Sequence, residues 1–135
     1  MKRRIFVNSA RDILGLGLVT QTLGSCFKNS VGPSPTAGFT VDLSSSANST
    51  LKTVGGFILT RGIYVICTAT STYIALSSIC THQGCTVNYG ATSKQFSCPC
   101  HGGLFDISGK VLGGPPPSPL KQYTVALSGT TLTIS

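Results

Sequence analysis

The stretch Cys80-Thr-His-Gln-Gly-Cys85 is followed, after twelve residues, by Cys98-Pro-Cys-His-Gly-Gly103. We call these segments the first box and the second box. Together they hold four of the six cysteines and both histidines of the chain. Thiolate and imidazole groups are ligands for zinc and for iron. Six such groups in two short segments therefore indicate a metal site.

Each box offers one cysteine and one histidine that a single loop could bring to one metal: Cys80 with His82, and Cys98 with His101. This leaves Cys85 and Cys100, which occupy matching places in the two boxes. They could bond to each other in a compartment that permits disulfides. A structural Cys2His2 zinc site is the alternative, although zinc-finger spacing differs and a spare cysteine pair is unusual there. The remaining Cys67 lies in an apolar run and is expected to be a buried core thiol.

Composition restricts both the fold and the chemistry. The chain has 135 residues, which suits one domain with a short additional segment. It contains three acidic residues, all aspartate, so a pair of carboxylates for general acid–base catalysis is hard to build. The apolar residues are mostly β-branched, aromatic or leucine, and glycine and serine are frequent, which favours an all-β domain with many turns.

The net charge of +7 does not predict nucleic-acid binding. Part of it comes from Lys2, Arg3 and Arg4 at the very beginning of the chain. The cations that follow are scattered, without runs and without interleaved aromatic residues. We therefore expect no nucleic-acid partner.

The first residues read as an export signal, predicted over residues 1–25. A basic segment precedes the short apolar run Ile13–Val19, which is too short to span a bilayer. Arg3-Arg4-Ile5-Phe6-Val7 resembles a twin-arginine signal. Leu23-Gly-Ser-Cys26 resembles a bacterial lipobox, with Cys26 as the lipidated residue. These features predict a protein of the bacterial cell envelope, anchored to the membrane by lipid on the periplasmic side.

Residues 26–38 are rich in Pro, Gly and Ser and are predicted to form a flexible tether. From Phe39 to the end, short β-like runs alternate with turns. Strands are predicted over 39–43, 57–60, 63–69 and 73–78, with Arg61-Gly62 as a tight turn, and a closing hairpin is predicted from 122–128 and 131–134. The boxes are then expected to lie on loops of a small antiparallel β scaffold.

With the two boxes, the segment Gly114-Pro-Pro-Pro-Ser-Pro-Leu120 resembles the proline loop of Rieske [2Fe–2S] proteins. The resemblance is to the disulfide-containing kind found in quinol-oxidising cytochrome bc-type complexes and related exported electron carriers. It implies a small antiparallel β sandwich over residues 39–135, with a loop-built cluster-binding part at about 78–119. It also implies a Rieske-type [2Fe–2S] cofactor.

Carried over residue by residue, the resemblance assigns Cys80 and Cys98 to the inner iron and His82 and His101 to the outer iron. Cys85 and Cys100 would form the disulfide. Neutral imidazoles in place of two thiolates raise the cluster potential into the range of about −150 to +300 mV. No separate catalytic residue is implied, because the chain would carry electrons and turn over no substrate of its own.

Three residues depart from the pattern of quinol-oxidising, high-potential members of the family. Many high-potential members have Ser where this chain has Gly103 and Tyr where it has Phe105, and those hydroxyls donate to sulfur atoms. Without these donors the reduced cluster is less stable, so a potential in the lower part of the family range is expected. Gln83 stands where quinol-oxidising members often have Leu. These departures favour a stand-alone tethered carrier, or a small subunit resembling that of arsenite oxidase, over the bc-type subunit.

The expected partners are a redox donor, either a quinol-oxidising membrane complex or a periplasmic dehydrogenase, and a cytochrome-like acceptor. The alternative function is that of the iron–sulfur subunit of a quinol–cytochrome c oxidoreductase complex. A ferredoxin-type feeder of a ring-hydroxylating oxygenase fits less well, because such feeders are cytosolic and lack the disulfide.

Overall fold

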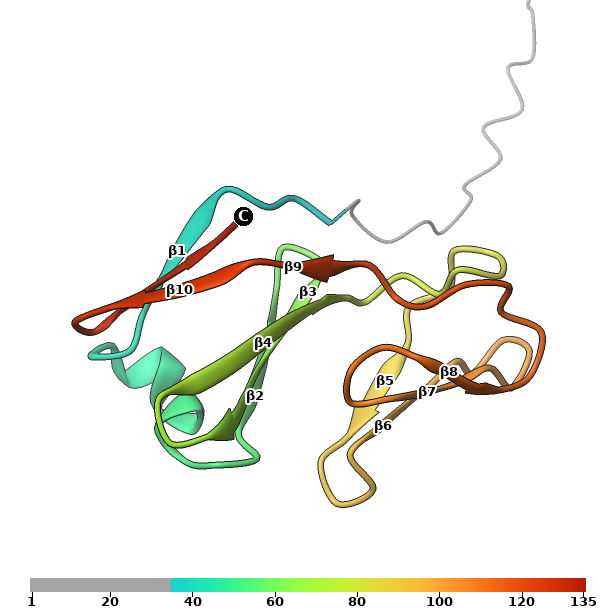
Figure 1. Cartoon of the computed structure of the whole chain (residues 1–135), viewed down its shortest axis with the longest axis horizontal. Coiled ribbons are helices and arrows are strands. Elements are labelled where there is room, and N and C mark those ends of the chain that lie inside the picture. The colour runs from blue at the N-terminus through green and yellow to red at the C-terminus, as the bar shows by residue number, and fades with distance from the viewer. Residues whose placement is uncertain (1–34) are drawn as a thin grey trace, which may run out of the picture.

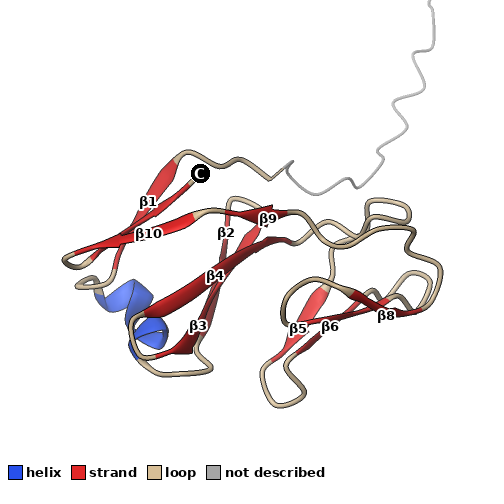
Figure 2. Ribbon diagram, viewed as in Figure 1, coloured by secondary structure: helices blue, strands red, loops and turns tan. Residues whose placement is uncertain are grey.

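The computed structural model describes residues 35–135, which form three antiparallel sheets (Figures 1 and 2). The signal segment and Cys26 lie outside the described residues. One sheet has the order β1-β11-β10 and a second has the order β2-β3-β4-β9. The third has the order β5-β6-β7-β8 and lies to one side of the other two (Figure 1). This architecture confirms the all-β prediction.

The elements run as follows: β1 (Phe39–Asp42), η1 (Ser46–Lys52), β2 (Phe57–Thr60), β3 (Ile63–Ala69), β4 (Thr72–Ser77), β5 (Asn88–Gly90), β6 (Gln95–Ser97), β7 (Leu104–Asp106), β8 (Val111–Gly113), β9 (Gln122–Tyr123), β10 (Val125–Ser128) and β11 (Thr131–Ile134). The short 3-10 helix η1 lies between the strands predicted over 39–43 and 57–60. Its one buried side chain, Leu51, packs into the core of the first two sheets.

Strand β3 is the centre of the molecule because both of its faces are buried. Ile63 and Val65 point into the core between the first two sheets. Tyr64 and Ile66 point the other way, into a second core that contains residues of both boxes and of the third sheet. Alternate side chains of a strand lie on opposite faces, so a strand with two buried faces needs an almost continuous apolar run. The sequence IYVICTA has this composition.

The tight turn before β3 occurs where it was predicted. Arg61 and Gly62 both have positive φ values, 51° and 74°, between paired residues Thr60 and Ile63. Positive φ at both central residues is the geometry of the two-residue turns that suit the right-handed twist of a hairpin.

The predicted strand over 122–128 is divided in two. Residue Thr124 exchanges backbone hydrogen bonds with Ser135, and the chain changes sheets at that point. Strand β9 before it pairs with β4, whereas β10 after it pairs with β11. The closing hairpin therefore contains only β10 and β11.

The cluster-binding part is more regular than the sequence indicated. Residues between and after the boxes form the four-stranded sheet β5-β6-β7-β8 rather than plain loops. Phe96 of β6 and Phe105 of β7 are directly paired, and both are fully buried. This sheet holds the second box between β6 and β7, and the first box leads into β5.

The last residues of the predicted tether are bound to the domain. The backbone N–H groups of Thr36 and Gly38 donate hydrogen bonds to the carbonyls of Arg61 and Ile134.

Candidate metal centre

The two boxes fold into loops with the same hydrogen-bond pattern. In the first, Gly84 N donates to Cys80 O and Cys80 N donates to Cys85 O. In the second, Gly102 N donates to Cys98 O and Cys98 N donates to the carbonyl of Gly103. Each loop thus begins at a cysteine whose backbone is fixed at both its N–H and its C=O.

Glycine is required in both loops by the backbone. Gly84 has φ of 75° and Gly102 has φ of 74°, in the left-handed region that side chains disfavour. Their amides donate to backbone carbonyls, so the turn itself accounts for these two glycines. Gly103 has no such φ value, but the ring of Pro116 lies against its Cα.

The first cysteine of each loop is buried, with 2% exposure for Cys80 and 3% for Cys98. Both belong to the second core, which also contains Tyr64 and Phe96. Burial raises the pKa of the Cys80 thiol, and the neighbouring Cys98 side chain raises it further. The backbone N–H groups of His82 and Gln83 lower it, because they donate to the sulfur. The structure therefore brings the two thiols together beneath the loops.

The two histidines also meet. The rings of His82 and His101 pack edge to face with centroids 4.8 Å apart. His101 is exposed, whereas the Nδ1 atom of His82 is buried and has no hydrogen-bond partner among the described residues. Burying a ring nitrogen that has no hydrogen-bond partner costs free energy unless the nitrogen binds another group. Iron is a natural partner, because imidazole nitrogen is one of its ligands. The same two loops carry two buried thiols and two adjacent imidazoles, which are the donor types of a centre with mixed sulfur and nitrogen ligands.

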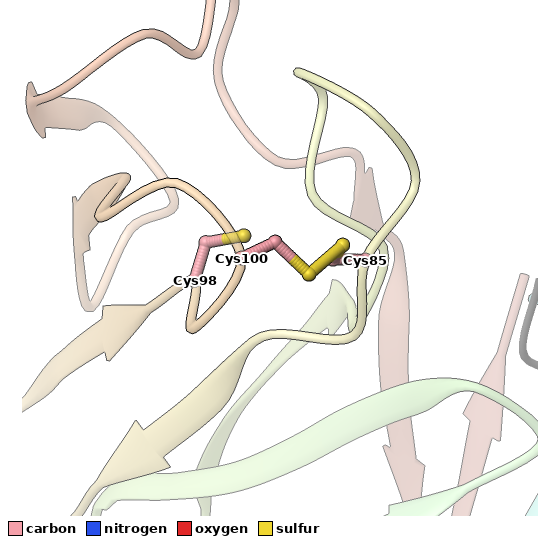
Figure 3. Close-up of side chains that lie close together, drawn as sticks. All are labelled: Cys85, Cys98 and Cys100. Atoms are coloured by element: carbon pink, nitrogen blue, oxygen red, sulfur yellow. A yellow bond between two sulfur atoms is a disulfide. The ribbon is translucent and has the colours of Figure 1, made fainter.

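A disulfide joins the loops. The structure bonds Cys85 of the first box to Cys100 of the second, the pair that the family resemblance implies. Cys98 directs its sulfur toward this bond from the same loop as Cys100 (Figure 3), and the three sulfur atoms lie within 4.8 Å of one another. Two of them are used in the disulfide, so this trio is not itself a set of metal thiolates.

The proline loop, Gly114–Leu120, covers the second box and reaches the first. The hydroxyl of Thr81 donates to Ser118 O at 2.6 Å. Pro116 is buried against Gly103. The sequence did not reveal either contact, because each joins segments that are far apart along the chain.

Comparisons with known proteins agree with this geometry. The sequence profile of the Rieske [2Fe-2S] domain matches residues 40–124. The chain is 44% identical to the cytochrome b6-f complex iron-sulfur subunit of Chlorobaculum thiosulfatiphilum over 61 residues. These residues make up 45% of this chain and 34% of that protein. The corresponding subunit of Chlorobaculum tepidum is 43% identical over 61 residues. The matching segment spans about a third of the length of these curated relatives.

Solved structures give the same result. The cyanobacterial plasma membrane Rieske protein PetC3 from Synechocystis PCC 6803 superposes with a TM-score of 0.56 at 33% identity, covering 70% of this chain and 98% of that one. A chain of a hyperthermophilic respiratory Complex III superposes with a TM-score of 0.52 at 28% identity. The superposition covers 85% of this chain and 84% of that one. The chain belongs to the Rieske [2Fe–2S] domain family, whose cofactor is a Rieske-type [2Fe–2S] cluster.

Proposed function

We propose that this protein transfers one electron at a time as the iron–sulfur subunit of a quinol-oxidising cytochrome complex of the bc or b6f type. The convergence of the two loops on a buried thiol pair and a histidine pair supports electron transfer. The similarity to cytochrome b6-f iron-sulfur subunits favours the complex over a stand-alone carrier. The sequence departures at Gln83, Gly103 and Phe105 had favoured the stand-alone carrier, and the comparisons weigh against that preference.

The ligands we assign are Cys80, Cys98, His82 and His101. The buried thiolates of Cys80 and Cys98 would hold the inner iron, since their surroundings exclude water. His82 would bind the outer iron through Nδ1, because that atom is buried and unpartnered. When bound, the cluster takes up and releases one electron.

The exposed side of the site is the histidine side. His101 is open to solvent, so a redox partner can approach the centre there. Binding iron through Nδ1 leaves Nε2 of His82 to hold or release a proton, which would couple proton transfer to electron transfer. The disulfide joins the two loops that carry these histidines.

The ligand assignment is tested by substitution and iron analysis. Changing any one of Cys80, His82, Cys98 or His101 to serine or alanine is expected to abolish the bound iron and the visible absorption of the cluster. Cys67→Ser is the matched control, because Cys67 is equally buried at 2% exposure but lies outside the boxes. Full cluster content in one of the four variants would remove that residue from the ligand set.

Membership of a complex is tested by co-purification. A tagged full chain isolated from gently solubilised membranes of its own host should bring a b-type cytochrome with it, detected by its haem spectrum. Isolation of the cluster-loaded chain alone, without haem, would support the stand-alone carrier instead. The Cys80→Ser chain serves as a control for contacts that do not need the cluster.

We further propose export by the twin-arginine route and lipidation of Cys26, which the tether of residues 26–38 would connect to the domain. Among residues 35–135, no helix is long and apolar enough to cross a membrane. Mass spectrometry of the mature chain tests the anchor. A diacylglyceryl group on Cys26 and its loss in Cys26→Ser are expected, whereas an unmodified thiol would refute it.

A further inference from the structure

Gly103 lacks a side chain for a steric reason. It is buried and its φ lies outside the left-handed region, so its backbone conformation does not demand glycine. A Cβ atom placed on it would lie 2.5 Å from Cγ and 3.0 Å from Cδ of Pro116. Real Cβ atoms essentially never approach another heavy atom closer than 3.0 Å. The ring of Pro116 thus occupies the space that a side chain at position 103 would need.

Pro116 has little freedom to move aside. Its pyrrolidine ring is rigid and its φ is fixed. The proline loop is held to the first box by the Thr81–Ser118 hydrogen bond. Near its other end it is in close backbone contact with the second box, since a Cβ on Gly114 would lie 2.8 Å from Gly102 O and 2.9 Å from Gly103 Cα. Relief of the clash would therefore require the whole loop to shift.

The blocked space lies beside a proposed ligand. The next nearest atom to the Cβ position of Gly103 is Cβ of Cys98, at 3.5 Å. A short polar side chain at position 103 would therefore stand next to a ligand cysteine, where a hydroxyl could donate to sulfur. Such a donor stabilises the reduced, more negative cluster and raises its potential.

We propose that Pro116 sets the reduction potential of this protein by excluding any side chain, and hence any hydroxyl donor, at position 103. The proposal rests on the proposed function, because it concerns the same cluster. It makes the low potential a property of a pair of residues, Gly103 and Pro116. A side chain can enter at position 103 only if the residue at position 116 is smaller than proline.

A double-mutant cycle on the full chain tests this, with the midpoint potential measured by redox titration. Gly103→Ser alone is expected to leave the potential unraised and to lose cluster faster, because the proline loop is displaced. Pro116→Ala alone changes the potential little. In the double variant, the equilibrium constant for reduction should be about tenfold larger than additive single effects would give. For one electron, this is a midpoint potential ~59 mV above the additive value.

Gly113→Ser is the matched control. Gly113 also lies close to the proline loop in sequence, but a Cβ on it would meet nothing within 4 Å. It should tolerate serine with unchanged potential and cluster retention. A rise in potential with Gly103→Ser alone, equal to that of the double variant, would overturn the proposal.

A second readout does not depend on the cluster. Thermal unfolding of Gly103→Ala, Pro116→Ala and the double variant should show strong coupling, with the double variant more stable than the sum of the single effects predicts. Additive effects would contradict the steric contact. A wild-type chain that binds no [2Fe–2S] cluster would refute the proposed function and the potential-setting role, whereas coupling in unfolding would still report the contact.

Discussion

At the scale of single residues, Phe105 shows how a missing hydroxyl bears on the cluster. Its ring is fully buried in the core that also contains Cys80 and Cys98. A tyrosine here would place its hydroxyl inside that core, where a sulfur atom is the acceptor that the family resemblance implies.

We predict that Phe105→Tyr raises the midpoint potential, with roughly a tenfold change in the equilibrium constant for reduction. This corresponds to about 1.4 kcal/mol, within the range of about 0.5–1.5 kcal/mol that one hydrogen bond contributes. Redox titration provides the measurement. Phe39→Tyr adds the same hydroxyl in the other core and should leave the potential unchanged. An unchanged potential in Phe105→Tyr would mean that the hydroxyl finds no sulfur acceptor.

Asp106 braces the turn between β7 and β8. Its Oδ1 atom accepts hydrogen bonds from Ser108 Oγ at 2.6 Å, Ser108 N at 2.8 Å and Lys110 N at 3.0 Å. The Ser108 hydroxyl is the main reason why the pKa of this carboxyl is lowered from its usual 3.8. A lowered pKa in the folded state means that the charged carboxylate stabilises the fold.

We predict that Asp106→Asn lowers the free energy of unfolding by less than about 1 kcal/mol at neutral pH, since the site is near the surface and the amide oxygen still accepts. The stabilisation is present above the unfolded pKa, near 3.8, and is lost as pH falls through the lower folded value. Denaturant unfolding of both proteins from pH 7 to pH 2.5 should show the difference shrink below about pH 4. A difference that is independent of pH would contradict a charge effect.

At the scale of elements, the proline loop depends on a contact with the first box. Thr81→Val removes the hydroxyl that donates to Ser118 O while keeping a similar shape. We predict several-fold faster loss of the cluster in the presence of a chelator, followed by visible absorption. Thr81→Ser keeps the donor and should restore most of the retention. Equal loss rates in wild type and Thr81→Val would show that the loop does not need this bond.

The longer strands were predictable because their local signals agree. The run of β3 is continuous and apolar, and Arg61-Gly62 before it can adopt positive φ. The third sheet was missed because its strands have only three residues each, too few to show a two-residue period. The division at Thr124 was missed because it is set by pairing with Ser135 rather than by a local breaker.

The residues of the site could be predicted from the sequence, but the contacts around them could not. Residue type and spacing were sufficient to select the cysteines and histidines of the boxes. The contacts that surround them were not predictable, since the Thr81–Ser118 and Gly103–Pro116 contacts depend on how the proline loop folds back. The glycines illustrate the difference: Gly102 is explained by its own φ, whereas Gly103 is explained only by a distant ring.

At the scale of the whole molecule, two cores share one strand. Strand β3 contributes Ile63 and Val65 to the base of the molecule and Tyr64 and Ile66 to the part that holds the boxes. The hydroxyl of Tyr64 donates to Val87 O, just after the first box, which links this strand directly to the site. The two parts are therefore joined through packed side chains as well as through the chain, so the boxes are held on a firm base.

The most direct test of the central claim is a potentiometric titration of the full chain with detection by low-temperature electron paramagnetic resonance. We predict a Rieske-type signal that appears on one-electron reduction, with a midpoint in the lower part of the family range of about −150 to +300 mV. The low value follows from the absence of hydroxyl donors at Gly103 and Phe105. A fully metallated protein that shows no such signal would contradict the cluster assignment, and a midpoint near the upper end would contradict our explanation of the potential.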